Sequence, residues 1–138
     1  MAHVIHFTTD RFDPATEPAN PINPIPGQAV LAWLCSELQA SDYDTTDTAA
    51  EDWGWYAYTQ SGSMSYMLGA SGEPEFASGA PKPDKYFHWV IAITERRSLR
   101  DRLFGRNKML ADDELSATVV RLLRAQGDFR ITDIEREK

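Results

Sequence analysis

Two short runs of strand-like sequence, joined by a tight turn, constrain this chain more than any other feature. Residues 52–60 and 63–70 are rich in aromatic and small side chains and have the length of ordinary strands. Ser61 and Gly62 lie between them, and a two-residue connection that contains glycine is typical of a β-hairpin. The sequence therefore predicts an antiparallel pair of strands, which needs further strands or a helix beside it to be stable.

The two faces of this hairpin differ in character. A turn at those two residues would place Trp55 opposite Leu68 and Trp53 opposite Ala70, on a face that we expect to meet the core. Side chains alternate between the faces of a strand, so the other face carries three large amphipathic or flexible groups. These are Tyr56, Tyr58 and Met67.

Periodicity predicts the remaining elements, with strands at 3–9, 86–95 and 129–134 and helices at 27–40, 98–105 and 112–125. Residues 42–52 and 71–85 are predicted to be loops. The order is β-α-β-β-β-α-α-β in one domain that spans 1–138, as expected for a chain of 138 residues. The fold class predicted is α+β: a two-layer sandwich of a mainly antiparallel sheet with helices on one face, or a ferredoxin-like variant of it.

A proline-rich segment follows the first strand. Residues 10–26 hold five of the eight prolines, which restrict the backbone and remove hydrogen-bond donors. We expect an ordered or semi-rigid loop, and a loop of this length often covers an edge or a site.

Charge is distributed unevenly along the chain. The net charge is −7, yet residues 96–108 hold six cations against Asp101, and residues 42–52 hold five acids and no cation. Opposed segments of this kind can contact each other within one chain or between copies, and the alternative is two solvated segments. Leu99 and Phe104 are expected to anchor the basic helix to the core, with its arginines in solvent. The net negative charge of the chain does not favour a membrane or a nucleic acid as its partner.

Signatures of catalysis and of metal binding are missing from the sequence. It contains no phosphate-binding glycine loop, no GxSxG elbow and no HExxH helix. His3 and His6 would point to opposite faces of one strand, so we expect no metal site and no cofactor. The sequence leaves open the alternative that His6 and His88 form a pair on neighbouring strands. Cys35, the one cysteine, is expected to be a buried structural thiol.

These features predict a small acidic protein that binds or interacts without catalysis, of a regulatory or immunity type. The N-terminal residues lack the pattern of a secretory signal, so we expect the protein to be located in the cytoplasm. A protein partner, and first of all a second copy in a homodimer, is expected on the aromatic sheet face, unless residues 10–26 or 71–85 fold over that face. The predicted binding residues are Tyr56, Tyr58, Met67, Tyr86, His88 and Val90. The alternative is a small-molecule enzyme with its site on the same face around His88.

Overall fold

The computed structural model describes residues 2–74, 76–77, 80–81, 87–106, 109 and 113–136. Its elements are β1 (Ala2–Thr9), α1 (Gln28–Ala40), β2 (Asp44–Thr45), β3 (Ala49–Glu51), β4 (Gly54–Ser61), β5 (Met64–Pro74), β6 (Phe76–Ala77), β7 (Ala80–Pro81), β8 (Phe87–Arg96), α2 (Leu99–Leu103), α3 (Glu114–Arg124) and β9 (Arg130–Arg136). Each main predicted helix and strand is present, to within a few residues at its ends.

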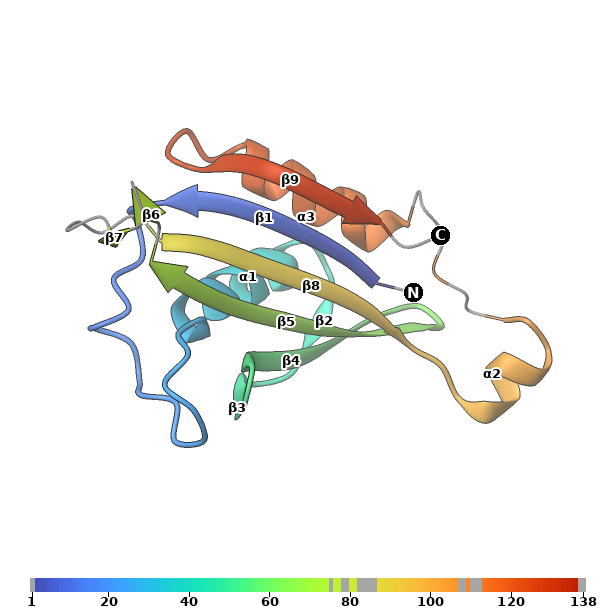
Figure 1. The fold of residues 1–138 in the computed structure, drawn as a ribbon. Coiled ribbons are helices and arrows are strands. Elements are labelled where there is room, and N and C mark those ends of the chain that lie inside the picture. The colour runs from blue at the N-terminus through green and yellow to red at the C-terminus, as the bar shows by residue number, and fades with distance from the viewer. Residues whose placement is uncertain are drawn as a thin grey trace.

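The strands form one large antiparallel sheet (Figure 1). Its order is β2-β4-β5-β8-β1-β9, with β3 also paired to β4, so that seven strands take part. Strands β6 and β7 pair separately. The predicted α+β class with a mainly antiparallel sheet is confirmed. Residues 71–74, which were expected to be part of a loop, instead extend β5 along β8.

The core lies between the sheet and the helices α1 and α3, which are both behind the sheet in Figure 1. Alternate residues of the central strands point into it, and both helices add an apolar stripe. Fully buried members include Ile5, Phe7, Leu31, Leu34, Leu38, Leu68, Trp89, Ile91, Ile93, Leu115, Val119 and Leu123. Among the described helices, none is both long and apolar enough to cross a bilayer.

The hairpin of β4 and β5 turns one residue later than predicted. Gly62 and Ser63 form the turn, and Trp55 pairs with Ala70 in place of Leu68. Gly62 has a φ of 59°, which favours glycine at the first position of a two-residue turn. Because the register moves by two residues, each side chain from position 55 onward keeps the face that was predicted for it.

Trp53 is the exception, since it does not join the core face. Strand β4 begins only at Gly54, whose φ of 148° interrupts the alternation before Trp55. The Trp53 side chain lies instead over Gly69, where an added Cβ would come within 2.7 Å of the indole ring. Gly69 and Trp53 therefore share the face of the sheet that is turned away from the helices.

Helix α2 also departs from the prediction. The capping box of Ser98 and Asp101 is present, but Leu99, Leu103 and Phe104 are 74%, 72% and 67% exposed and do not anchor the helix to the core. Strand β8 continues to Arg96 and carries the chain beyond the helix layer before α2 begins (Figure 1). Helical periodicity indicates an apolar face, but it does not show whether another element is near enough to cover it.

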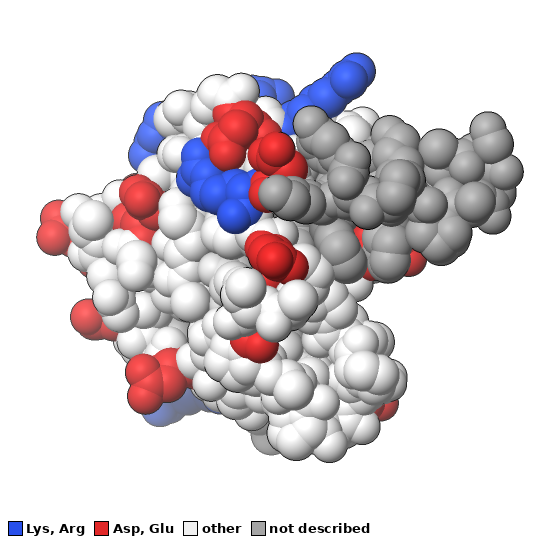
Figure 2. All heavy atoms as spheres, turned by 90° about the vertical axis from the view of Figure 1, so that its left-hand side faces the viewer, with Lys and Arg blue, Asp and Glu red and all other residues white. Residues whose placement is uncertain are grey.

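The proline-rich loop is fastened at the helix side of the molecule. The Glu17 carboxylate accepts hydrogen bonds from the N–H groups of Gly27 and Gln28, at 3.1 and 2.7 Å, and so caps α1. The Asn20 amide donates to the carbonyl of Gly54. Figure 2 views this end of the molecule, where the lower half carries mainly uncharged groups and scattered acids. In Figure 1 residues 10–26 run beside the lower left of the sheet and do not cross the middle of the face that is turned away from the helices.

Candidate functional site on the open sheet face

The predicted binding residues share one face of the sheet, opposite α1 and α3. Tyr58 pairs with Met67, and Val90 lies between Ser71 and His6 in neighbouring strands. Tyr56, Tyr58, Met67, His88 and Val90 are all half-buried, whereas the residues between them in each strand face the core. Tyr86 lies outside the described residues. Five of the six predicted positions thus come together on what is called here the open face, and their role in binding stays a prediction.

An aromatic corner occupies the β4 side of the open face. The Tyr56 and Tyr58 ring centroids are 5.5 Å apart, and the Arg96 guanidinium carbon lies 3.9 Å from the Tyr58 centroid. The Trp53 ring covers Gly69 beside them. Cation–π contacts at exposed sites contribute about 0.5–1 kcal/mol, so this contact favours a position of the Arg96 side chain against the Tyr58 ring.

A cleft of about 600 Å³ lies between this corner and α2. Its lining joins the open face to the basic segment: Tyr58, Ser63, Ser65, Met67, Thr94, Glu95, Arg96, Arg97, Ser98, Asp101 and Arg102. A smaller hollow of about 210 Å³ beside it is lined by both Asp44 and Arg96. The corner therefore brings the acidic and the basic segments of the chain to the same edge of the sheet.

Residues 97–106, called the arm, lie beside this corner and carry exposed apolar and cationic side chains. Arg97 donates to the carbonyls of Asp101 and Arg106, at 3.2 and 3.0 Å, which holds the arm in a compact turn. Within the described part of the chain, Arg100 and Arg102 make no ion pair, so the predicted contact of these cations with an acidic surface is not satisfied there. Their charges stand in solvent together with the exposed leucines.

A polar cluster occupies the opposite side of the open face, where β9 forms the edge. His6 Nδ1 lies 3.0 Å from His88 Nε2, so the histidine pair that the sequence left open is present. His6 Nε2 lies 3.2 Å from Glu135 Oε2, and Asp133 stands directly across from His6. Asp133 and Glu135 were missed because nothing in the sequence shows that residues 130–136 pair with the first strand.

The three hydrogen-bonded groups of this cluster form a chain along which a proton can move. In the neutral form, His88 Nε2–H donates to His6 Nδ1 while His6 Nε2–H donates to the Glu135 carboxylate. A protonated His6 would donate to both neighbours instead. Either arrangement fixes the orientation of the His6 ring, which is 23% exposed, while Glu135 is 60% exposed.

Two other reactive side chains are buried on the helix side and take no part in this face. His3 Nδ1 lies 2.6 Å from Ser116 Oγ, and burial lowers the pKa of the imidazole. His3 and His6 therefore do point to opposite faces, as predicted. Burial raises the pKa of the Cys35 thiol to about 11, which keeps it protonated and poorly nucleophilic near neutral pH.

No family model matches this chain, and no curated protein or solved structure shows significant similarity to it. The geometry of the open face is therefore the basis for a functional proposal.

Proposed function

We propose that this protein is a non-enzymatic interaction protein whose open face and arm bind another polypeptide, with a second copy of the chain as the occupant. The observation that carries the proposal is the arm, in which Leu99, Leu103 and Phe104 are exposed beside the aromatic corner. A group of neighbouring exposed apolar side chains is more typical of an interaction surface than of a surface that faces only solvent. The cytoplasm stays the proposed location, since one buried cysteine needs no oxidising compartment.

The order of the strands supports a two-layer, ferredoxin-like scaffold as part of this proposal. Strands β9, β1, β8 and β5 are consecutive antiparallel neighbours, and with α1 and α3 they follow the β-α-β-β-α-β order. Strand β4 would then be an addition at the β5 edge. In such a scaffold both main helices cover one face, and the other is left for a partner.

Burial of the apolar groups on the arm would contribute a free energy of the same order as the cost of association. Complete burial of a Leu or Phe side chain contributes about 1.5–3 kcal/mol. A two-fold dimer would bury six of them, three from each copy, for roughly 9–18 kcal/mol. Association of two proteins costs about 4–15 kcal/mol, so burial of the arm is of the size that a dimer requires.

Charge favours a second copy over other partners. The acidic residues 42–52 and the basic arm adjoin the same corner, where Asp44 and Arg96 line one hollow. A two-fold axis beside that corner would set each arm against the acidic edge of the partner, and the same contact would occur twice. Tyr58 and Val90 would then lie under the partner, since both are on the open face.

Light scattering and sedimentation test the dimer. We expect a dimeric wild type and a monomeric Tyr58→Glu, Val90→Glu double variant, because a charge buried in an interface without a partner is strongly unfavourable. Ile22→Glu with Ala117→Glu is the matched control, since it adds the same charge at exposed positions away from the open face. A monomeric wild type, or a dimer that survives both open-face charges, contradicts the proposal.

The hydrogen-bonded chain Glu135–His6–His88 favours one second candidate, a small-molecule enzyme with its site around His88. A carboxylate that orients a histidine, which in turn orients another group, is the arrangement used in general acid–base catalysis. Screening small fragments by NMR tests it: ligands should perturb the signals of His88 and its neighbour Thr8, and His88→Gln should remove the binding. If every fragment binds the variant as it binds the wild type, the enzyme candidate loses its support.

A further inference from the structure

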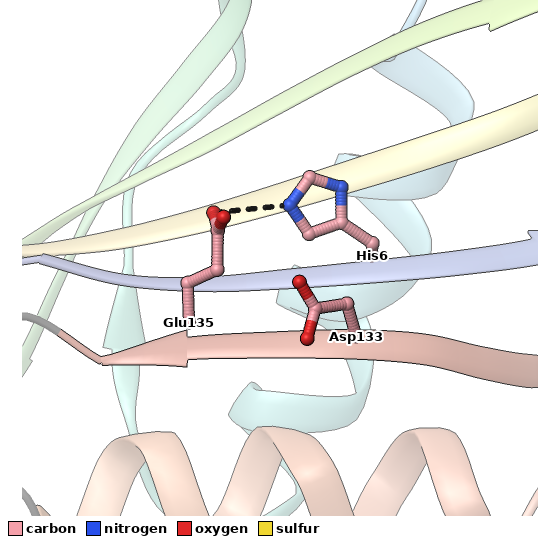
Figure 3. A group of neighbouring side chains, drawn as sticks. All are labelled: His6, Asp133 and Glu135. Atoms are coloured by element: carbon pink, nitrogen blue, oxygen red, sulfur yellow. Dashed lines mark hydrogen bonds and ion pairs between the residues drawn. The ribbon is translucent and has the colours of Figure 1, made fainter.

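We propose that His6, Asp133 and Glu135 form a binding site for a divalent transition-metal ion, with His88 orienting His6 from behind. Figure 3 shows the three side chains standing on the same face of two neighbouring strands, with the His6 ring turned toward Glu135. The site lies at the β9 edge, and so at the opposite side of the open face from the aromatic corner. It does not depend on the proposed dimer.

The backbone brings these three residues together through an irregularity in the pairing of β1 and β9. Between His6 and Phe7 the register shifts, so that Phe7 pairs with Ile131 while His6 pairs with Asp133. The bulge lets Ile131 and Ile134 both pack against the core, and it leaves Asp133 and Glu135 on the open face. Bulges often re-aim side chains beside functional sites, and this one assembles three potential ligands.

The distances between the donor atoms suit one ion. One ligand atom of each residue lies within 4.8 Å of the others, and His6 Nε2 is 3.2 Å from Glu135 Oε2. Ligands bound at about 2.0–2.2 Å to a tetrahedral ion are about 3.3–3.6 Å apart. The His6–Glu135 pair is therefore already close to the separation that a shared ion imposes, and Asp133 offers an oxygen within 4.8 Å of both.

The chemistry of the donors selects the class of ion. One imidazole nitrogen with two carboxylate oxygens suits Zn²⁺, Mn²⁺ or Fe²⁺, whereas Ca²⁺ and Mg²⁺ prefer oxygen ligands alone. The two carboxylates balance the charge of a divalent ion. Three protein ligands leave at least one coordination position for water, and the exposure of Asp133 and Glu135 keeps that position open to solvent.

His88 supplies the outer contact that such sites require. When His6 donates its Nδ1–H to His88 Nε2, the lone pair of His6 Nε2 is directed toward the carboxylates. The observed separation of 3.0 Å is that of a hydrogen bond. Metal binding at Nε2 requires this tautomer, in which the hydrogen bond between the two imidazole rings runs in the opposite direction to that of the ion-free neutral form. A change at His88 should therefore weaken the site without removing a ligand.

Calorimetric titration of the metal-free protein with Zn²⁺ tests the proposal. We expect one ion per chain, no binding of Mg²⁺ at the same concentration, and an affinity lowered at least about tenfold by His6→Gln, Asp133→Asn or Glu135→Gln. His88→Gln should lower it by about tenfold, the effect typical of outer contacts. Asp47→Asn removes an exposed carboxylate from the acidic loop and is the matched control, with no expected effect.

A second measurement needs no variant and separates loss of a ligand from loss of the fold. In NMR spectra of the histidine side chains, saturating Zn²⁺ should shift the Nε2 resonance of His6 strongly, that of His88 weakly and that of buried His3 not at all. Absence of Zn²⁺ binding at millimolar concentration overturns the proposal. Binding that all three ligand variants retain, or that leaves the His6 signals unmoved, overturns it as well.

Discussion

The Arg96 guanidinium carbon lies 3.9 Å from the centre of the Tyr58 ring, and this contact joins the end of β8 to the aromatic corner of the open face. Each of the two residues also lines the cleft beside α2. The contact thus orients the start of the arm relative to the sheet.

A double-mutant cycle measures this contact. Arg96→Gln and Tyr58→Leu should each lower the free energy of unfolding, and their coupling should amount to about 0.5–1 kcal/mol in urea denaturation. Arg100→Gln is the control, because Arg100 is exposed and should change the stability by less than about 0.5 kcal/mol. Strictly additive effects of the two substitutions would show that the ring and the guanidinium do not interact.

Gly54, like Gly27, is a glycine at which an added side chain should be damaging. Its φ is +148°, and an added Cβ would come within 2.4 Å of the backbone oxygen of Ala70 on the neighbouring strand. Gly54→Ala combines a strained backbone with a clash against backbone, so we expect a loss of at least about 2 kcal/mol in denaturant titration. Gly127→Ala has open space around its Cβ and serves as the control. Equal stability of the two variants would contradict the structure of the β3–β4 turn.

His3 should make the stability depend on pH. Burial holds the pKa of folded His3 below its ordinary 6.5, although the nearby Asp113 carboxylate acts in the opposite direction. The unfolded chain then binds more protons than the folded chain at and below pH 6.5, so the free energy of unfolding falls as the pH falls through that value. We expect His3→Gln to show a smaller decrease between pH 7.5 and 5 in parallel urea titrations. Identical slopes would show that the two states bind the His3 proton equally.

Several features of this fold could be predicted from sequence because they depend on the period of a strand. A register error of two residues left Tyr58 and Met67 on the correct face, since alternation survives any even shift. The assembly of His6 with Asp133 and Glu135 could not be predicted in this way. It depends on which strand lies beside β1 and on a bulge, and both are properties of the whole sheet.

The exposure of α2 was missed for a related physical reason. The spacing of Leu99 and Leu103 correctly indicates an apolar side of the helix, but burial also requires a neighbouring element within reach. That element depends on where β8 ends relative to the helices, and the local sequence does not contain this information.

The fold should not depend on a metal ion. Its stability comes from the apolar core between the sheet and the helices, whereas the His6 cluster lies at the surface. A strong chelator should change the thermal midpoint by less than about 2 °C, which corresponds to well under 1 kcal/mol for a domain of this size. Added Zn²⁺ should raise the midpoint, since a ligand that binds only the folded state stabilises it. A large fall of the midpoint on chelation would show that a metal is part of the fold.

The cations of the arm provide the test of the charge contact between copies. Arg100→Glu with Arg102→Glu reverses two exposed charges that have no ion pair within the described residues, and in a dimer these charges would face the partner's acidic residues 42–52. Exposed ion pairs contribute about 0.2–1 kcal/mol each and weaken with salt, so the dimer dissociation constant should rise at least about twofold at low salt. At high salt the difference should shrink.

Arg121→Glu with Arg124→Glu makes the same charge change at exposed positions of α3 and controls for the net charge of the protein. It removes cations from the last turn of that helix, so it should lower stability by about 0.3–1 kcal/mol for each residue without weakening the dimer. The two double variants therefore separate a contact between copies from a general electrostatic effect. If the arm variant leaves both assembly and stability unchanged from low to high salt, the arm makes no contact with an acidic surface. The apolar groups alone would then have to account for any association.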